Sequence, residues 1–285
     1  MSLDDLTFVE RYGPWALVAG ASEGVGAEYA RAMAQRGLNV VLLARRQDEL
    51  DTLAAAVRAE TGVETRAVTV DLAGTDAMTK ILDATAGVEI GMMMYCAGAD
   101  PNYASFLANP VEIPLALVHR NCLVPMQMCH QFAGPMAIRG RGAIVLVSSA
   151  AGLAGAPNMV AYGASKAFDM VMAEALWAEL HDSGVDVLSL VLGVTDTPAL
   201  RRLLTRRGAL ADPRDPIPIE GVSTGAEVVR EAIANLSNGP TWLVGDHLRE
   251  SSKLLRALTR NEAVMAMIQQ SGGAMAARPD AQVSA

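Results

Sequence analysis

Three side chains in one short segment are suited to moving a proton on or off an oxygen atom. In SSAAGLAGAPNMVAYGASKAF, Ser149 precedes Tyr162 by 13 residues and Lys166 follows Tyr162 by four. A spacing of four places Tyr162 and Lys166 on one face of a helix. A free tyrosine has a pKa of about 10, so acid–base work near pH 7 requires roughly 4 kcal/mol of preferential stabilisation of its anion. A lysine ammonium about 4 to 5 Å away in a partly dry cleft supplies a few kcal/mol of this, so Lys166 is required.

A glycine-rich turn is suited to holding a diphosphate. Gly20 ends the strand-like run WALVAG, and Gly24 and Gly26 follow it before the helical pattern AEYARAMAQRG. Glycine lets the backbone approach a ligand, and the free N–H groups of a helix starting at about Val25 stabilise phosphate charge. Turns of this kind also serve close packing alone. The position after the first strand favours a nucleotide site.

The end of the second strand-like run predicts which dinucleotide binds. In LLARRQ, Ala44 stands where a carboxylate would hold the ribose of NAD, and Arg45 and Arg46 follow it. Arg45 is therefore expected to bind the 2′-phosphate of NADP(H), and one charge-assisted bond corresponds to roughly ten- to hundredfold preference. The alternative is a solvated arginine pair at a helix start, and Glu23 would weaken the preference if it lies nearby. NADP(H) is preferred and NAD(H) remains possible.

Short apolar runs alternate with helical patterns along the chain and must position these residues. The runs are 15–20, 39–44, 65–70, 90–97, 143–148 and 185–192, with 241–245 as a seventh candidate. They show little polar alternation, which indicates burial on both faces of a sheet. The pattern predicts an α/β fold with a doubly wound parallel sheet.

Residues 1–270 are expected to form a single domain, and no repeat, low-complexity block or linker divides the first 195 of them. Within it, 195–221 has four prolines, four closely spaced arginines and weak strand or helix continuity, which is typical of a substrate lid. The lid arginines form either a solvated helix face or a site for a phosphate-bearing carrier. Residues 271–285 are small and polar and are expected to be a flexible tail.

Composition restricts the partners and the compartment. A net charge of −8 gives no general footprint for nucleic acid, and none is expected as a partner. The amino-terminal residues lack a secretory pattern, and the one long uncharged stretch, 142–165, is too rich in glycine and serine for a membrane span. Three cysteines without C-x-x-C spacing suit a reducing, cytoplasmic compartment. The four histidines lack metal-binding spacing, so no metal site is expected.

The glycine loop, the acid Asp71 after the third strand, Ser149 and Y-x-x-x-K, in this order, resemble the short-chain dehydrogenase/reductase family over about residues 13–200. The resemblance implies a Rossmann-like fold of about seven strands and an oxidoreductase that interconverts a ketone and a secondary alcohol. Tyr162 resembles the family's general acid/base, Lys166 its ribose-binding cation and Ser149 its carbonyl hydrogen-bond donor. Asn121 resembles the helix asparagine that completes the tetrad.

The same resemblance implies a set of cofactor contacts along the loops that follow the strands. Asp71 would accept a hydrogen bond from the adenine amino group, although an Asp before a helix is also an ordinary turn residue. Besides Tyr162 and Lys166, the implied contacts are Gly20, Ser22, Glu23, Gly24, Val25, Gly26, Arg45, Asp71, Leu72, Ala97, Gly98, Val194 and Thr197. Ala19 and 95–98 (YCAG) depart from the family's usual Thr and Asn-Asn-Ala-Gly, which puts the bracing of the cofactor loop in doubt.

The cofactor half is most similar to 3-oxoacyl-CoA reductases and 17β-hydroxysteroid dehydrogenases, and the candidate pocket walls indicate a small apolar carbonyl or alcohol substrate. The walls are Tyr103, Phe106, Leu107, Leu153, Ala154, Met159, Val160, Leu200, Leu203 and Leu204. The alternatives are an NAD-dependent alcohol or hydroxysteroid dehydrogenase and a non-catalytic NADP(H)-binding regulator. Family members commonly pair the helices expected at 114–133 and 161–182, so a homodimer or homotetramer is expected.

Overall fold

The apolar runs form one parallel sheet. The computed structural model of the chain describes residues 3–100 and 102–270, and seven strands pair in the order β3-β2-β1-β4-β5-β6-β9. The strands are β1 (Trp15–Ala19), β2 (Asn39–Ala44), β3 (Thr65–Thr69), β4 (Ile90–Tyr95), β5 (Gly142–Ser149), β6 (Val185–Leu192) and β9 (Thr241–Leu243). All neighbours are parallel. The predicted doubly wound sheet is confirmed, including its seventh strand.

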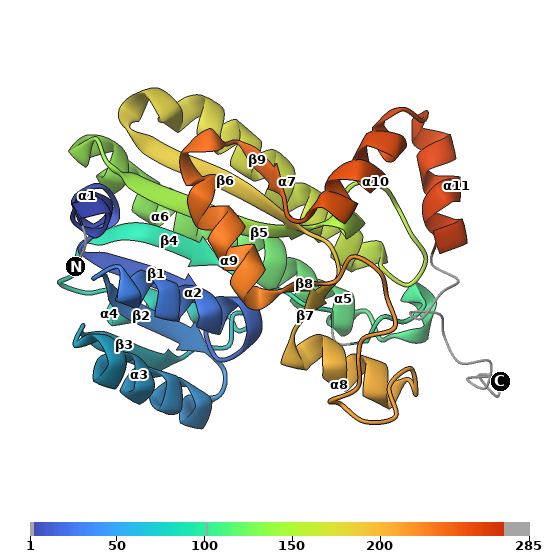
Figure 1. Cartoon of the computed structure of the whole chain (residues 1–285), viewed down its shortest axis with the longest axis horizontal. Helices are drawn as coiled ribbons and strands as arrows, with labels where there is room; N and C mark the ends of the chain where they lie inside the picture. Colours follow the sequence, from blue (N-terminus) through green and yellow to red (C-terminus); the bar gives the residue numbers. More distant parts are fainter. Residues whose placement is uncertain (1–2, 101, 271–285) are drawn as a thin grey trace.

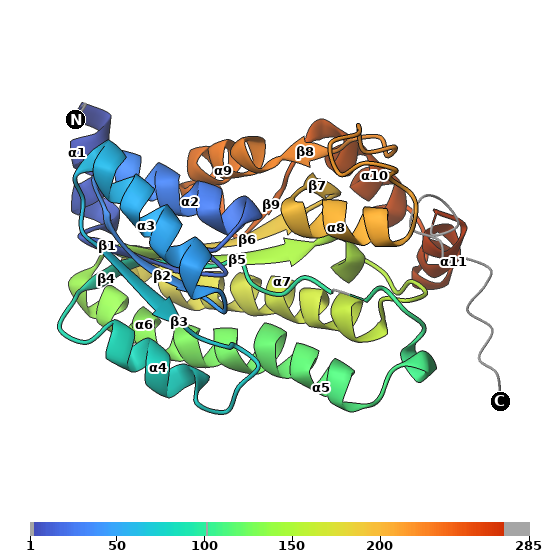
Figure 2. The same ribbon diagram turned by 90° about the horizontal axis from the view of Figure 1, so that it is seen from below.

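Helices cover both faces of the sheet (Figure 2). One face carries α2 (Gly24–Gln35), α3 (Gln47–Thr61) and α9 (Gly225–Ala234), and the other carries α4 (Ala77–Ala84), α6 (Val124–Arg139) and α7 (Val160–Leu180). Tyr29 and Met33 of α2 belong to one apolar core, and Met128 and Phe132 of α6 belong to the other. The sheet is buried on both sides, which explains why its strands show little polar alternation.

Two helices lie at opposite ends of the molecule (Figure 1). The first, α1 (Leu3–Tyr12), is fixed to the start of β6, because Arg11 and the Tyr12 hydroxyl each donate a 2.7 Å hydrogen bond to Asp186. The last, α11 (Arg260–Gln270), follows α10 (Asp246–Arg256), and Arg260 donates to the carbonyl oxygen of Leu153 at 2.8 Å. Among the described residues, α1 therefore lies at the amino-terminal ends of the strands and α11 near their carboxyl ends.

The segment 195–221 contains more regular structure than the sequence indicated. Here β7 (Thr195–Asp196) pairs with β8 (Ser223–Thr224), and α8 (Pro198–Arg206) follows β7. Thr197 caps α8 by accepting a hydrogen bond from the Leu200 N–H at 3.2 Å, and Pro198 fits the first helical position because that N–H needs no partner. The tail expected at 271–285 lies outside the described residues.

The strand order reverses between β1 and β4, and parallel sheets bind ligands beyond the carboxyl ends of the strands at such a point. Near it, α5 (Glu112–Val118) continues through a five-residue π-turn, His119–Leu123, into α6. The remaining short turns are Phe106–Ala108, Ala150–Gly152, His181–Ser183 and Leu236–Asn238. Over the described ranges, no helix combines the length and apolarity needed to cross a membrane.

Candidate active site

The glycine loop connects β1 to α2 with its backbone tightly folded. A side chain at Gly26 would place its Cβ 2.1 Å from the Gly20 carbonyl oxygen, so no larger residue fits. The N–H groups of Gly20 and Ala21 donate to the Leu43 carbonyl at 2.8 and 3.1 Å, which seats the loop at the end of β2. The structure begins α2 at Gly24, one residue before the start expected from the sequence.

The amino-terminal end of α2 has the character of an anion site. Glu23 occupies the N-cap position but makes no capping hydrogen bond. The first N–H groups of a helix have no partner within the helix and carry a partial positive charge. Together with the glycine backbone, this end fits the diphosphate of a dinucleotide.

Ion pairs at the glycine loop form what we call the rim cluster: Glu23, Arg46 and Arg202. The Glu23 carboxylate accepts from Arg46 at 2.9 Å and from both terminal nitrogens of Arg202, one at 2.9 Å. Burial raises the pKa of the Glu23 carboxyl, but hydrogen bonds from Arg202 and Arg46 outweigh burial and hold that pKa below its usual range. Arg202 lies on α8, so the rim cluster joins the glycine loop to segment 195–221.

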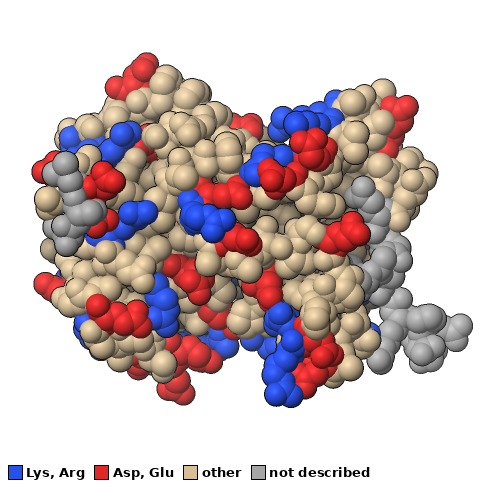
Figure 3. All heavy atoms as spheres, viewed as in Figure 1, with Lys and Arg blue, Asp and Glu red and all other residues tan. Residues whose placement is uncertain are grey.

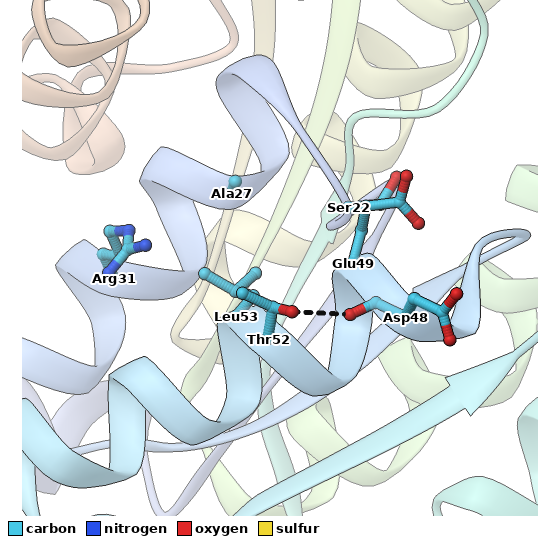
Figure 4. Close-up of a pocket in the computed structure, with 7 residues that line it drawn as sticks. All are labelled: Ser22, Ala27, Arg31, Asp48, Glu49, Thr52 and Leu53. Atoms are coloured by element: carbon cyan, nitrogen blue, oxygen red, sulfur yellow. Dashed lines mark hydrogen bonds between the residues drawn. The ribbon is translucent and has the colours of Figure 1, made fainter.

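Arg46 also contacts Ser22, one of the residues expected to bind the cofactor. Its guanidinium donates to the Ser22 hydroxyl at 3.2 Å and lies 3.1 Å from Glu49. Arg45, in contrast, is exposed at the end of β2. Figure 4 shows Ser22 and Glu49 at the edge of a hollow of about 300 Å³ between α2 and α3. The structure therefore brings Arg46 into the loop network and leaves Arg45 facing solvent.

The candidate catalytic residues come from the end of β5 and the first turns of α7. Ser149 is the last residue of β5, and its Oγ accepts a hydrogen bond from the Ala151 N–H at 3.2 Å. A Cβ on Gly163 would lie 2.8 Å from the Ala151 carbonyl oxygen, so α7 approaches this turn closely. The Ser148 hydroxyl donates to the Lys166 carbonyl at 2.7 Å. These contacts position Tyr162 and Lys166 beside the end of β5.

Lys166 is buried, with 3% of its surface exposed. Its Nζ donates to the Val147 carbonyl at 2.8 Å and to Oδ2 of Asp169 at 2.9 Å. Burial raises the pKa of the Asp169 carboxyl, against the lowering effect of the Lys166 ammonium. Asp169 was not identified from the sequence, where its spacing of three from Lys166 on one helix was the available signal.

Asn121 lies in the π-turn and is fully buried. Its Nδ2 donates to the Gly98 carbonyl at 3.1 Å and to the Ser165 hydroxyl at 2.9 Å. Ser165 in turn donates to the Tyr162 carbonyl at 2.8 Å. A π-turn re-aims one side chain of a helix, and here it links Asn121 to the helix that carries Tyr162. Ser165 and Ser148, two braces of this helix, were not identified from the sequence.

Gly98 brings the backbone of the β4 loop against this cluster. Its φ of +129° is unfavourable for other residues, and a Cβ there would lie 2.8 Å from Asn121 Oδ1 and 3.1 Å from Lys166 Nζ. Only glycine leaves that space open. The Lys166 ammonium therefore faces the loop that the sequence predicted to contact a cofactor.

The other expected cofactor contacts follow the strand ends, with varied local partners. Asp71 is exposed and accepts a hydrogen bond from the Ala73 N–H at 3.0 Å, an ordinary turn contact. Thr197 caps α8, and its Cγ2 would lie 3.2 Å from a Cβ on Gly24. Leu72 and Val25 are buried, Ala97 follows β4, and Val194 follows β6 and accepts from the Ser223 N–H at 3.0 Å.

Beside α8 lies a second hollow, of about 410 Å³, on the expected substrate side. It is lined by Asn102, Ala104, Asn109, Leu203, Arg206 and Arg207. Tyr103 is buried beneath the guanidinium of Arg207, 4.8 Å from its ring centre, whereas Phe106 and Leu107 are exposed. Arg201 pairs with Asp196 at 2.6 Å. Positive and negative side chains alternate over the face seen in Figure 3.

The cysteines are free thiols that lie near the site without chemistry of their own. Burial raises the pKa of Cys96 and of Cys129 to about 12 and that of Cys122 to about 11. A thiol rather than a thiolate is present near pH 7, and the thiolate is the nucleophile. The three thiols therefore supply no nucleophile near pH 7.

Comparison with known proteins agrees with this architecture. The family model described as short chain dehydrogenase matches residues 14–208. The 7β-hydroxysteroid dehydrogenase of Collinsella aerofaciens is 33% identical over 242 residues, 85% of this chain and 90% of that protein. The human very-long-chain 3-oxoacyl-CoA reductase is 31% identical over 182 residues, but this match spans 63% of the chain and 58% of the relative.

Solved structures extend the likeness to nearly the whole chain. A structure from work on 7β-hydroxysteroid dehydrogenase stereoselectivity superposes with a TM-score of 0.83 at 32% identity, covering 91% of this chain and 98% of the other. A short-chain dehydrogenase from Sphingobium yanoikuyae in complex with NADPH gives 0.73 at 26% identity, covering 95% and 99%.

Proposed function

The chain belongs to the short-chain dehydrogenase family and is an oxidoreductase acting on CH–OH groups; on that premise, we propose that it interconverts a ketone and a secondary alcohol on an apolar, steroid-like substrate with NADP(H). The observation that carries the proposal is the packing of α7, which carries Tyr162 and Lys166, against the carboxyl end of β5, where Ser149 lies, with Lys166 Nζ beside Gly98. Nucleotide binding alone does not require the serine and tyrosine, which argues against a non-catalytic regulator.

The side chains divide the reaction between them. NADP(H), when bound, supplies or accepts the hydride. In reduction, the hydroxyls of Ser149 and Tyr162 donate hydrogen bonds to the carbonyl oxygen, where negative charge develops. Tyr162 gives its proton to that oxygen, so the ketone becomes an alcohol and a tyrosinate remains. The Lys166 ammonium stabilises the tyrosinate, and Asn121 braces the start of α7 through Ser165.

The preference for NADP(H) rests on the cations after β2. Arg45 and Arg46 together would hold the 2′-phosphate, with Arg46 oriented by its contact to Ser22. A related short-chain dehydrogenase was solved with NADPH. Glu23 and Glu49 already neutralise part of this charge, which supports use of NAD(H) as the second cofactor.

A steroid-like substrate is favoured over an acyl thioester. The relatives that match most of the chain are named 7β-hydroxysteroid dehydrogenases, whereas the reductase of acyl-CoA substrates matches a shorter part. Two of the arginines that would bind a phosphate-bearing carrier, Arg201 and Arg202, are engaged by Asp196 and Glu23. Segment 195–221 would then serve as a lid over an apolar ring system.

The proposed enzyme works as a homodimer or homotetramer in the cytoplasm. Apolar side chains from α5 to α7 are exposed on the single chain, which suits association between copies: Leu115, Val118, Leu123, Met126 and Val171. Free thiols suit a reducing compartment.

The decisive experiment measures NADPH consumption with steroid ketones, simpler ketones and 3-oxoacyl thioesters, with NADH as the second cofactor. Tyr162→Phe is expected to bind NADPH as the parent does and to lose about 10²- to 10⁴-fold in turnover. Turnover retained in Tyr162→Phe would show that Tyr162 is not the proton donor. Tight NADPH binding without turnover on any ketone would favour the regulator.

A further inference from the structure

Beneath the candidate site, α7 carries a buried ion pair that the proposed reaction does not by itself explain. Asp169 has 1% of its surface exposed and Lys166 has 3%, and Oδ2 lies 2.9 Å from Nζ. The two residues are three apart on one helix, so both point toward the same side of α7. Asp169 Oδ1 has no hydrogen-bond partner among the described residues. The hydrogen bond found for this carboxylate is therefore the one it accepts from Nζ.

Three thiols and one phenol lie within electrostatic range of the pair, with Cys96, which follows β4, beside Lys166 and the others beside Asp169. Tyr95 on β4, Cys122 in the π-turn and Cys129 on α6 all lie within electrostatic range of Asp169. Burial raises the pKa of each, so each is neutral near pH 7. The positive charge of Arg120 acts to lower the pKa of Tyr95, against the larger effect of burial. Arg120 itself donates from Nε to Asn121 Oδ1 at 3.2 Å. Within the described ranges, Asp169 is the carboxylate in ion-pair contact with Lys166.

A buried ammonium without a counter-charge loses its hydration and tends to release its proton. A neutral amine would not stabilise a tyrosinate. We infer that Asp169 is a positioning residue that keeps the Lys166 ammonium charged and fixed in place. Its catalytic consequence rests on the proposed function, but the charge state of Lys166 does not.

The contacts also give the ammonium a direction. Two of its three hydrogens are engaged, one by the Val147 carbonyl and one by Asp169. The third remains for the side of Gly98, where a Cβ would lie 3.1 Å from Nζ. Asp169 thus holds Nζ from the helix while Val147 holds it from β5.

The chain allows a direct test because it has only three lysines, Lys80, Lys166 and Lys253. With lysine ¹³C-labelled at Cε, NMR reports the titration of each ammonium, and Lys80 and Lys253 serve as exposed internal references. In Asp169→Asn, the Lys166 resonance is expected to titrate at a pH lower by about one unit or more than in the parent. Unchanged titration of Lys166 would overturn the inference, whether or not any ketone is turned over.

Kinetics separate positioning from simple support of the fold. In Asp169→Asn, kcat for alcohol oxidation near pH 7 is expected to fall about ten- to hundredfold, with KM less affected. The pH profile of kcat is expected to move to higher pH, because a neutral Lys166 would no longer stabilise the tyrosinate. Asp169→Glu is expected to restore part of kcat and the profile. Glu174→Gln, on the same helix and bonded to Thr241, is the matched control and should leave the profile in place. A loss of kcat with an unmoved profile would assign Asp169 a structural role only.

A variant that fails to fold is still informative. If Asp169→Asn unfolds because an unpaired charge is buried, adding Lys166→Met is expected to restore folding, since it removes that charge. Circular dichroism and thermal melts measure this. A double variant that stays unfolded would show that Asp169 serves packing and would overturn the inference.

Discussion

Two groups of ion pairs lie in the same candidate site and differ in their access to water. In the inner pair, the Lys166 and Asp169 side chains are 4% and 2% exposed. In the rim cluster, Glu23, Arg46 and Arg202 are 25%, 41% and 53% exposed. Water screens the rim charges, so their partners exchange at small cost, whereas a buried charge strongly affects its neighbours. The inner pair is suited to tuning chemistry, and the rim cluster is suited to exchanging partners with an arriving anion.

The largest effect is expected where the inner region meets the substrate. Ser149→Ala removes a donor to the carbonyl oxygen and should lower kcat about 10²- to 10³-fold, with NADPH affinity unchanged. Ser149→Thr keeps a hydroxyl and should lose less. Steady-state rates and fluorescence titration of NADPH measure both quantities. Equal loss in the two variants would indicate that space at the end of β5, not the hydroxyl, matters.

A second way to break the inner region is to fill the space in front of Lys166. Gly98→Ala is expected to lower kcat at least about tenfold and stability by about 1 to 3 kcal/mol, because its Cβ meets Asn121 and the backbone is strained. Gly62→Ala is the control, since Gly62 also has positive φ but no atom within 4 Å of a Cβ. Thermal melts and rates should separate the effect of backbone strain, present in both variants, from overlap of the new Cβ with Asn121, present only in Gly98→Ala. Identical behaviour of the two variants would contradict a role for the space in front of Lys166.

Smaller effects are expected at the rim. Arg45→Ala and Arg46→Ala should each lower the ratio of NADPH to NADH affinity about tenfold, because one charge-assisted bond to the 2′-phosphate is lost. Arg31→Ala is the control, because Arg31 pairs with Glu60 on the neighbouring helix. Binding titrations with both cofactors measure the ratio. A ratio unchanged in Arg45→Ala but lowered in Arg46→Ala would assign the site to Arg46 alone.

The smallest effect is expected from Glu23→Gln, which frees Arg46 and Arg202. NADPH affinity should rise a few-fold, and less so at high salt. Because the folded-state pKa of Glu23 is lowered, its contribution to stability is present above the ordinary glutamate pKa and is lost as pH falls through the folded-state value. Melting temperatures of parent and variant should therefore differ near pH 7 and converge as the pH falls below the folded-state pKa of Glu23. A difference in melting temperature that stays constant with pH would show that the ion pairs of Glu23 are not its cause.

Sequence reasoning reached the parts of the site that depend on local pattern. The strands were visible as apolar runs, the glycine loop as a spacing after the first of them, and Tyr162 with Lys166 as neighbours on one helical face. Contacts between distant segments were not visible. Glu23 and Arg202 are separated by 179 positions, and no local rule links the two.

Like contacts between distant segments, the burial of individual side chains could not be predicted from the sequence pattern. On α7, Asp169 and Glu174 are both acids in an apolar helix, yet Asp169 is buried against Lys166 and Glu174 bonds Thr241 from a half-buried position. Arg45 and Arg46 are adjacent and chemically equal in the sequence, but the turn after β2 sends only Arg46 toward Ser22. The π-turn at Asn121 lies just before Pro125, which has no N–H to donate to the Asn121 carbonyl; the proline is visible in the sequence, but the resulting direction of the Asn121 side chain is not.

The positions of α1 and α11 determine how the molecule would behave on a solid support. A linker attached to α1 would leave the carboxyl ends of the strands directed toward the solution, because α1 is fixed to the start of β6 at the other end of the sheet. A linker on α11 would bring the support close to the Leu153 loop, four residues after Ser149. Immobilisation through α1 therefore keeps the carboxyl ends of the strands open to solution, and attachment through α11 obstructs them.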